Sequence, residues 1–148
     1  MKKEYRSVEL GKETARKLKR FLRLHEIHFE TSECGDLIHF QILCDDNEET
    51  IANDYLSGRI FLTFFTFGTD ERFPYRDCYI VIEGDSGNDC INTFRKFFPD
   101  RTAHTINCAF LYNESEWDKT GMESHYGNPR LFLSNITQEW NTNYHYAY

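Results

Sequence analysis

The segment that most constrains the fold is residues 60–67, which is apolar on both faces of a strand. Side chains of a strand point alternately to opposite faces, and here Ile, Leu and Phe occupy odd and even positions alike. Such a strand belongs inside a sheet that is covered on both sides. The chain has enough apolar side chains to cover both faces of such a sheet, since 40% of its residues are hydrophobic and 16% are aromatic. We therefore expect residues 60–67 to be a buried strand that ties two halves of the fold together.

The residues before this strand follow a β-α-β-β-α order. Apolar alternation predicts strands at 5–10, 27–31 and 37–43, and apolar residues at helical spacing predict helices at 12–24 and 45–56. The turn at 32–36 contains Gly35, which suits a positive φ. This order is most of a ferredoxin-like, split β-α-β unit, in which helices cover one face of an antiparallel sheet. Residues 60–67 can supply its last strand.

The second half reads β-β-α-β. A loop is predicted at 68–77, strands at 78–83 and 105–112, and a helix at 85–98. Beyond residue 115 the pattern breaks into short pieces, with an apolar run at 131–133. We expect one α+β domain over 1–133, divisible into subdomains 1–58 and 59–133, with helices packed on a mainly antiparallel sheet. An aromatic tail follows over 134–148.

Charge is distributed unevenly along the chain. Residues 1–23 carry nine Lys and Arg against three Asp and Glu, although the whole chain has a net charge of −7. Five basic residues in the predicted helix 12–24 recur at spacings of three and four: Lys12, Arg16, Lys19, Arg20 and Arg23. Such a stripe is either a solvated helix face or a surface that meets phosphates or an acidic protein. The negative body argues against duplex DNA as a direct partner.

An acidic segment follows the basic helix. Between residues 24 and 58 there are nine Asp and Glu and no Lys or Arg. Six of these acids are candidates for binding a basic groove on another protein: Glu33, Asp36, Asp45, Asp46, Glu48 and Glu49. In that role they would mimic nucleic acid, and charge complementarity would set specificity and association rate. The alternative is structural, because acids at 45–49 are also typical of a helix N-terminus.

A third candidate site lies in the loop after residue 67. Cations and rings alternate there, at Arg72, Phe73, Tyr75 and Arg76. A loop of this kind can stack a base and bind a phosphate. The alternative is a loop that is anchored by its own aromatic residues.

Enzymatic patterns are scarce. His25, His28 and His39 match neither zinc-finger spacing nor H-E-x-x-H, so a metal-assisted hydrolase at these residues is the least favoured function. Residues 84–87, Gly-Asp-Ser-Gly, lack the Lys of a P-loop and are expected to cap a helix. We expect no cofactor. Five scattered cysteines and the absence of an apolar leader or a membrane span predict a reduced, cytoplasmic protein.

Two segments resemble known proteins. Residues 64–117, with the strand Tyr-Ile-Val-Ile-Glu-Gly at 79–84 and Ala-Phe-Leu-Tyr-Asn-Glu-Ser-Glu-Trp at 109–117, resemble a small uncharacterised protein that recurs in bacteriophages and prophages. Residues 29–38 are similar to small proteins of mobile elements. The resemblance implies an accessory role against host immunity: blocking a CRISPR effector or another defence complex, or sequestering a nucleotide signal. It provides no site residues.

Together these observations predict a non-enzymatic, phage-type anti-defence protein in the cytoplasm of the host bacterium. Its charged surfaces would bind and inhibit a host defence protein. The first alternative is a protein that sequesters a small nucleotide at Arg72 and Arg76, across the interface of a homo-oligomer.

Overall fold

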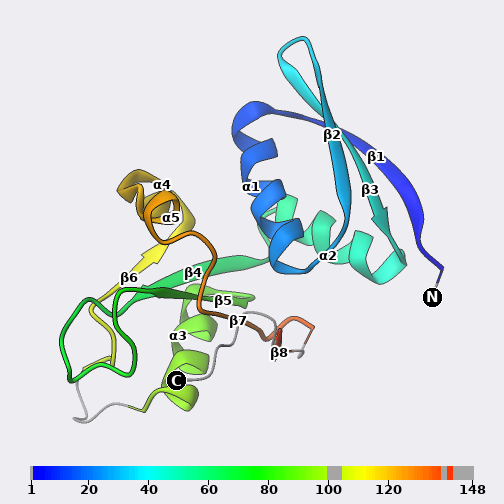
Figure 1. Cartoon of the computed structure of the whole chain (residues 1–148). Helices are drawn as coiled ribbons and strands as arrows, with labels where there is room; N and C mark the ends of the chain where they lie inside the picture. The colour runs from blue at the N-terminus through cyan, green and yellow to red at the C-terminus, as the bar shows by residue number, and fades with distance from the viewer. Residues whose placement is uncertain (1, 100–104, 138–139, 142–148) are drawn as a thin grey trace. The chain divides into compact units, whose positions relative to one another are not determined.

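The computed structural model of the protein describes residues 2–99, 105–137 and 140–141, without the side chains of the last two (Figure 1). The chain divides into two compact units, Met1–Arg59 and Ile60–Tyr148. Both units combine helices with a sheet, as the α+β prediction requires. None of the helices in the described ranges is long and apolar enough to span a bilayer.

The N-terminal unit contains the five elements predicted from the sequence. They are β1 (Glu4–Gly11), α1 (Lys12–Leu24), β2 (Phe29–Cys34), β3 (Leu37–Cys44) and α2 (Asp46–Leu56). The strands form an antiparallel sheet in the order β1-β3-β2. A two-residue turn joins β2 to β3, and Gly35 adopts the positive φ of 62° that this turn needs.

Both helices of this unit pack on the same face of its sheet. The residues of β3 alternate, so that Ile38, Phe40 and Ile42 are buried while the residues between them are partly exposed. Phe21 of α1 stacks on Tyr55 of α2 at 4.5 Å between ring centroids. The apolar stripe of α1 therefore closes a small core with β3 and α2.

The strand expected to complete this sheet lies elsewhere, so that part of the ferredoxin-like prediction is wrong. The segment forms β4 (Phe61–Thr66), which pairs with β5 (Tyr79–Gly84) and β6 (Phe110–Asn113) in a second sheet. The physical reason is burial: the sequence of β4 requires cover on both faces, and every residue from Leu62 to Thr66 is buried. The N-terminal sheet offers helices on one face only.

The C-terminal unit is built around this second sheet. Its strand order is β6-β4-β5-β7-β8, with β7 at Leu131–Ser134 and β8 at Trp140–Asn141. Pairing is antiparallel except between β5 and β7, which are parallel. Three helices accompany it: α3 (Gly87–Phe97), α4 (Glu114–Thr120) and α5 (Met122–Tyr126).

Helices α3 and α4 cover opposite faces of β4. Phe65 stacks on Phe94 of α3 at 4.3 Å, whereas its neighbour Phe64 stacks on Trp117 of α4 at 4.8 Å. Neighbouring strand residues point to opposite faces, so the sheet is covered on both sides at this strand. The prediction of a doubly covered buried strand is confirmed.

Local predictions in the second half are mostly confirmed, with two differences. The strand predicted at 105–112 is shorter, because residues 107–109 bend and the Cys108 amide donates to the Ile106 carbonyl at 2.7 Å. The α4 and α5 helices were not predicted. Of the predicted aromatic tail, residues 138–139 and 142–148 lie outside the described residues.

Candidate ligand-binding site

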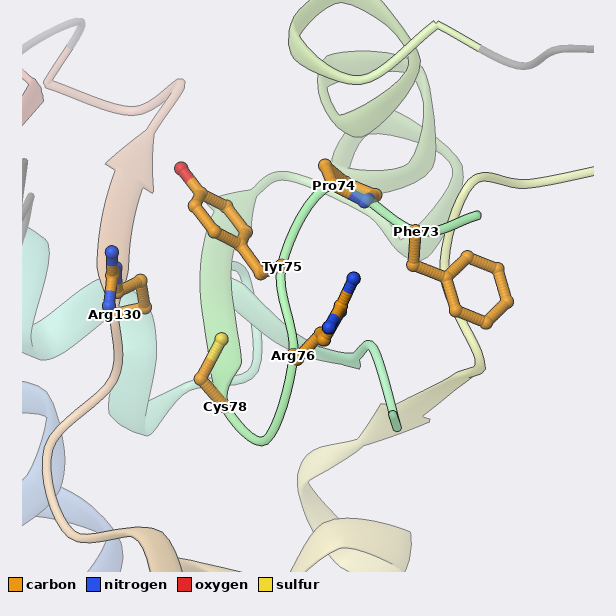
Figure 2. Close-up of a pocket in the computed structure, with 6 residues that line it drawn as sticks. All are labelled: Phe73, Pro74, Tyr75, Arg76, Cys78 and Arg130. Carbon is orange, nitrogen blue, oxygen red and sulfur yellow. The ribbon is translucent and has the colours of Figure 1, made fainter. Parts of the chain in front are cut away.

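A pocket of about 370 Å³ lies on the C-terminal unit, open to solvent (Figure 2). Its lining comes from the loop before β5 and from the segment that leads into β7: Phe73, Pro74, Tyr75, Arg76, Cys78 and Arg130. Three of the four residues predicted for a ligand therefore line one pocket, and Pro74, Cys78 and Arg130, which the sequence did not indicate, join them.

Tyr75 anchors the loop that forms the pocket. It is buried, and its ring meets Phe67 and Phe98 edge-on at centroid distances of 5.2 and 5.6 Å. The loop closes where the Asp77 amide donates to the Gly68 carbonyl at 2.9 Å. Gly68 adopts a φ of 61°, which glycine tolerates without strain. The loop is thus held by its own aromatic residues and also forms the pocket wall, so the two interpretations of its sequence are compatible.

Arg130 brings a second cation to the pocket from a distant part of the sequence. Its amide donates to the Tyr79 carbonyl at 2.8 Å, which fixes its backbone beside β5. Its guanidinium carbon lies over the Tyr75 ring, 5.3 Å from the centroid. A cation over an aromatic face is electrostatically favourable, so Tyr75 orients Arg130. The sequence shows Arg130 only as one cation in a segment of short pieces.

Arg76 and Cys78 complete the polar part of the pocket. Arg76 is exposed and pairs with Glu71 across 3.8 Å. Burial raises the pKa of the Cys78 thiol above its ordinary value, and the positive charge of Arg130 partly opposes this effect. The thiol is therefore neutral at pH 7 and adds no negative charge beside the arginines.

The other predicted loop residues have different roles. Arg72 is not among the residues that line the pocket, and it binds Asp70 with a closest approach of 2.7 Å. This hydrogen bond raises the pKa of Arg72. Phe73 is partly buried and packs against the core cluster around α3, and in Figure 2 its ring points away from Arg130. The prediction that Phe73 stacks on a ligand gains no support.

Four of the five basic residues predicted for a stripe on α1 are at least partly exposed. Lys12, Arg16 and Arg23 are exposed and Lys19 is partly exposed, whereas Arg20 is buried with 7% of its surface accessible. Arg20 precedes buried Leu24 by four residues and so shares its side of the helix. Arg16 forms an ion pair with Glu13 at 2.7 Å, and Arg23 lies over the Phe29 ring.

Most of the acidic candidates have partners within the N-terminal unit. The side chain of Asp45 accepts a hydrogen bond from the Glu48 amide, and Glu48 accepts one from the Asp45 amide, which is a capping box on α2. Arg6 of β1 binds Asp46 at 2.9 Å and Glu49 at 2.8 Å. The structural interpretation of residues 45–49 is therefore confirmed.

The remaining two acidic candidates lie at the hairpin between β2 and β3. Glu33 and Asp36 are both exposed there. They are separated from the acids that cap α2 by the length of β3, so the six acidic candidates do not form one cluster.

The three histidines do not assemble a metal site. His25 packs against Phe21, His28 lies 3.9 Å from Glu30, and His39 lies 3.5 Å from Glu9. Within residues 2–99, 105–137 and 140–141, no group of three His, Cys, Asp or Glu side chains is placed to hold a metal ion. In the described part of the chain, His25, His28 and His39 therefore do not converge on one such group.

The segment at residues 84–87 caps a helix, as predicted. The Ser86 hydroxyl accepts a hydrogen bond from the Asp89 amide at 3.1 Å at the start of α3. The Asp89 carboxylate in turn accepts a hydrogen bond from the Asp85 amide. This segment is therefore a structural turn.

Comparisons of the chain with protein-family models, with curated proteins and with solved structures found no match.

Proposed function

We propose that this protein binds a small phosphate-bearing ligand, of the nucleotide class, in the pocket formed by Tyr75, Arg76, Cys78 and Arg130. The observation that carries the proposal is that two arginines, 54 positions apart in the sequence, line one pocket beside an aromatic ring. The proposed function is capture of the ligand without catalysis.

The chemistry of the lining favours phosphate. A guanidinium presents several N–H donors in a planar fork that matches phosphate oxygens, and such charge-assisted hydrogen bonds are stronger than neutral ones. Tyr75 is rigidly held, which lowers the entropic cost of ordering Arg130 around a ligand. The pocket volume of about 370 Å³ is at the lower end of the range for small-ligand sites, so a mononucleotide suits it better than a larger ligand.

The test is a calorimetric titration of the full chain with a nucleoside monophosphate, the matching nucleoside and inorganic phosphate. We expect saturable binding of the nucleotide and weaker binding of its two parts. Arg76→Ala and Arg130→Ala should each weaken binding by about tenfold or more, because each removes a charge-assisted hydrogen bond. Arg59→Ala removes an exposed arginine of the other unit and should leave binding unchanged.

Cysteine alkylation supplies an independent readout of occupancy. Cys78 lines the pocket, whereas Cys34 is exposed on the N-terminal unit and serves as an internal control. A bound nucleotide should slow the alkylation of Cys78 and leave that of Cys34 unchanged. Saturable binding without protection of Cys78, or binding that survives both arginine substitutions, would place the ligand elsewhere and contradict the proposal.

The resemblance to phage proteins suggests a purpose for such capture. Removing a nucleotide signal from solution would silence a host defence that depends on the signal, and it needs no chemistry beyond tight binding. This biological role follows only from the resemblance, and it is tested by whether the protein protects an infecting phage in cells with nucleotide-activated defence.

Inhibition of a host defence protein through charged surfaces is the second candidate function. The line formed by exposed Lys12, Arg16 and Arg23 and partly exposed Lys19 favours it, as do exposed Glu33 and Asp36. An interface of this type should weaken steeply with salt. Recovery of the same host protein in low-salt and high-salt pull-downs, or of none in either, would argue against it.

A further inference from the structure

Strand β6 is an exposed apolar edge of the C-terminal sheet. It pairs with β4 on one side and with no strand of the described residues on the other. Phe110 is 66% exposed and Leu111 is 39% exposed, although successive residues of a strand point to opposite faces. An edge strand that is apolar on both faces invites pairing with another strand, and proteins usually protect such edges with charge.

We propose that β6 pairs antiparallel with β6 of a second copy of this chain, so that the two sheets continue through a twofold axis at Leu111. This inference is independent of the proposed ligand. The observation that selects a second copy is the symmetry of the strand sequence, Phe-Leu-Tyr, around its central leucine.

The proposed register brings like side chains together on each face. With Leu111 opposite its own copy, Phe110 of one chain lies opposite Tyr112 of the other. In one chain the Phe110 and Tyr112 rings already lie 6.3 Å apart on the face covered by α4. Two such pairs would form a cluster of four rings on that face and a leucine pair on the other. Aromatic pairs across strands stabilise a sheet, and a twofold interface requires this kind of self-complementarity.

Charge also favours this edge over the β2 edge of the N-terminal sheet. Two copies with a net charge of −7 each repel one another, so their contact needs a neutral seam. Residues 105–113 contain no charged side chain. By contrast, β2 is an edge strand that carries Glu30 and Glu33, and antiparallel self-pairing would place its acids close together.

A cysteine at the axis tests the register directly. Directly opposed residues of antiparallel strands have Cα atoms about 4.5 or 5.5 Å apart, and a disulfide requires about 4.4–6.8 Å. In a Cys34→Ser background, which removes the exposed native thiol, Leu111→Cys should form a covalent dimer under mild oxidation. Phe61→Cys is the matched control, since Phe61 is also an exposed apolar residue of the same sheet.

Sedimentation over a concentration series tests the association without a crosslink. The wild-type chain should dimerise, and Leu111→Lys, which places two cations at the axis, should raise the dissociation constant by at least about tenfold. Phe61→Lys should leave it unchanged, and circular dichroism checks that both variants fold. A wild-type monomer throughout, a dimer unaffected by Leu111→Lys, or crosslinking equal in the two cysteine variants would overturn the proposal.

Discussion

At the residue scale, Cys90 couples the stability of the C-terminal unit to pH. Its thiol is fully buried between α3 and the sheet and donates to the Ile82 carbonyl at 3.3 Å. Burial raises the pKa of Cys90 from 9.0 to about 11. Below pH 9 the folded and unfolded states both hold the proton. Between pH 9 and 11 the unfolded thiol ionises while the folded one does not, so this contribution is lost as the pH rises.

We expect the wild-type protein to lose about 2–3 kcal/mol more unfolding free energy than Cys90→Ala between pH 8 and 11. Urea denaturation at several pH values measures this difference. Other groups that titrate in this range contribute equally to the unfolding free energy of both proteins, so their contributions cancel in the difference. Parallel pH profiles for the two proteins would show that the thiol is not held neutral by burial.

Arg20 and Arg130 show where residue-level prediction fails. Spacing along the helix assigned Arg20 to a basic stripe, but the structure buries it beside Leu24. The residues next to Arg130 in the sequence do not indicate that its guanidinium lies over the Tyr75 ring. For Arg130 the environment is set by a residue that is distant in the sequence, which no local pattern reports.

At the element scale, the capping box of α2 gives Asp45 and Glu48 a structural role. Asp45→Ala removes the side chain that accepts the Glu48 amide at 2.8 Å, and it should cost about 1 kcal/mol of unfolding free energy. Asp45→Asn retains a capping oxygen and should restore most of that loss. Thermal denaturation of the three proteins measures both effects.

Asp54→Ala is the control for charge, because it removes an acid from the other end of the same helix. It should change stability by less than about 0.5 kcal/mol, since the ion pair between partly exposed Asp54 and exposed Arg59 contributes little. If Asp45→Asn were as destabilising as Asp45→Ala, the charge of Asp45 and not its capping oxygen would be responsible.

Helix α4 is an element that the sequence signals but that was not predicted. Asn113 and Glu116 form a capping box, with Asn113 accepting the Glu116 amide at 2.8 Å. An Asn followed three residues later by Glu is a recognised helix start. The helix has only seven residues, which is too short for an apolar periodicity to stand out, so only the cap could have indicated it.

At the scale of the whole molecule, the division into two units predicts partly independent folding. The N-terminal unit has a sheet, two helices and a core of its own around Leu18, Phe21 and Phe40. We expect residues 1–59, expressed alone, to give dispersed amide resonances and cooperative thermal unfolding. Because a unit of about 60 residues buries only about 60% of its surface, its stability should be lower than that of the full chain.

The matched control is a 1–59 variant with Phe40→Ala, which removes a fully buried ring from the core and should abolish the cooperative transition. Collapsed resonances for wild-type 1–59 would mean that this unit depends on residues beyond 59 for folding.

The sequence by itself determined the elements: three strands and two helices before residue 58, a doubly covered strand at 60–67, and a strand and a helix at 78–98. These follow from periodicity and capping, which are local properties of the chain. Only the tertiary structure decided which sheet β4 joins, that β7 runs parallel to β5, and that Arg130 shares a pocket with Tyr75 and Arg76. Pairing between distant segments depends on the free energy of burial summed over the fold, and no single segment carries that information.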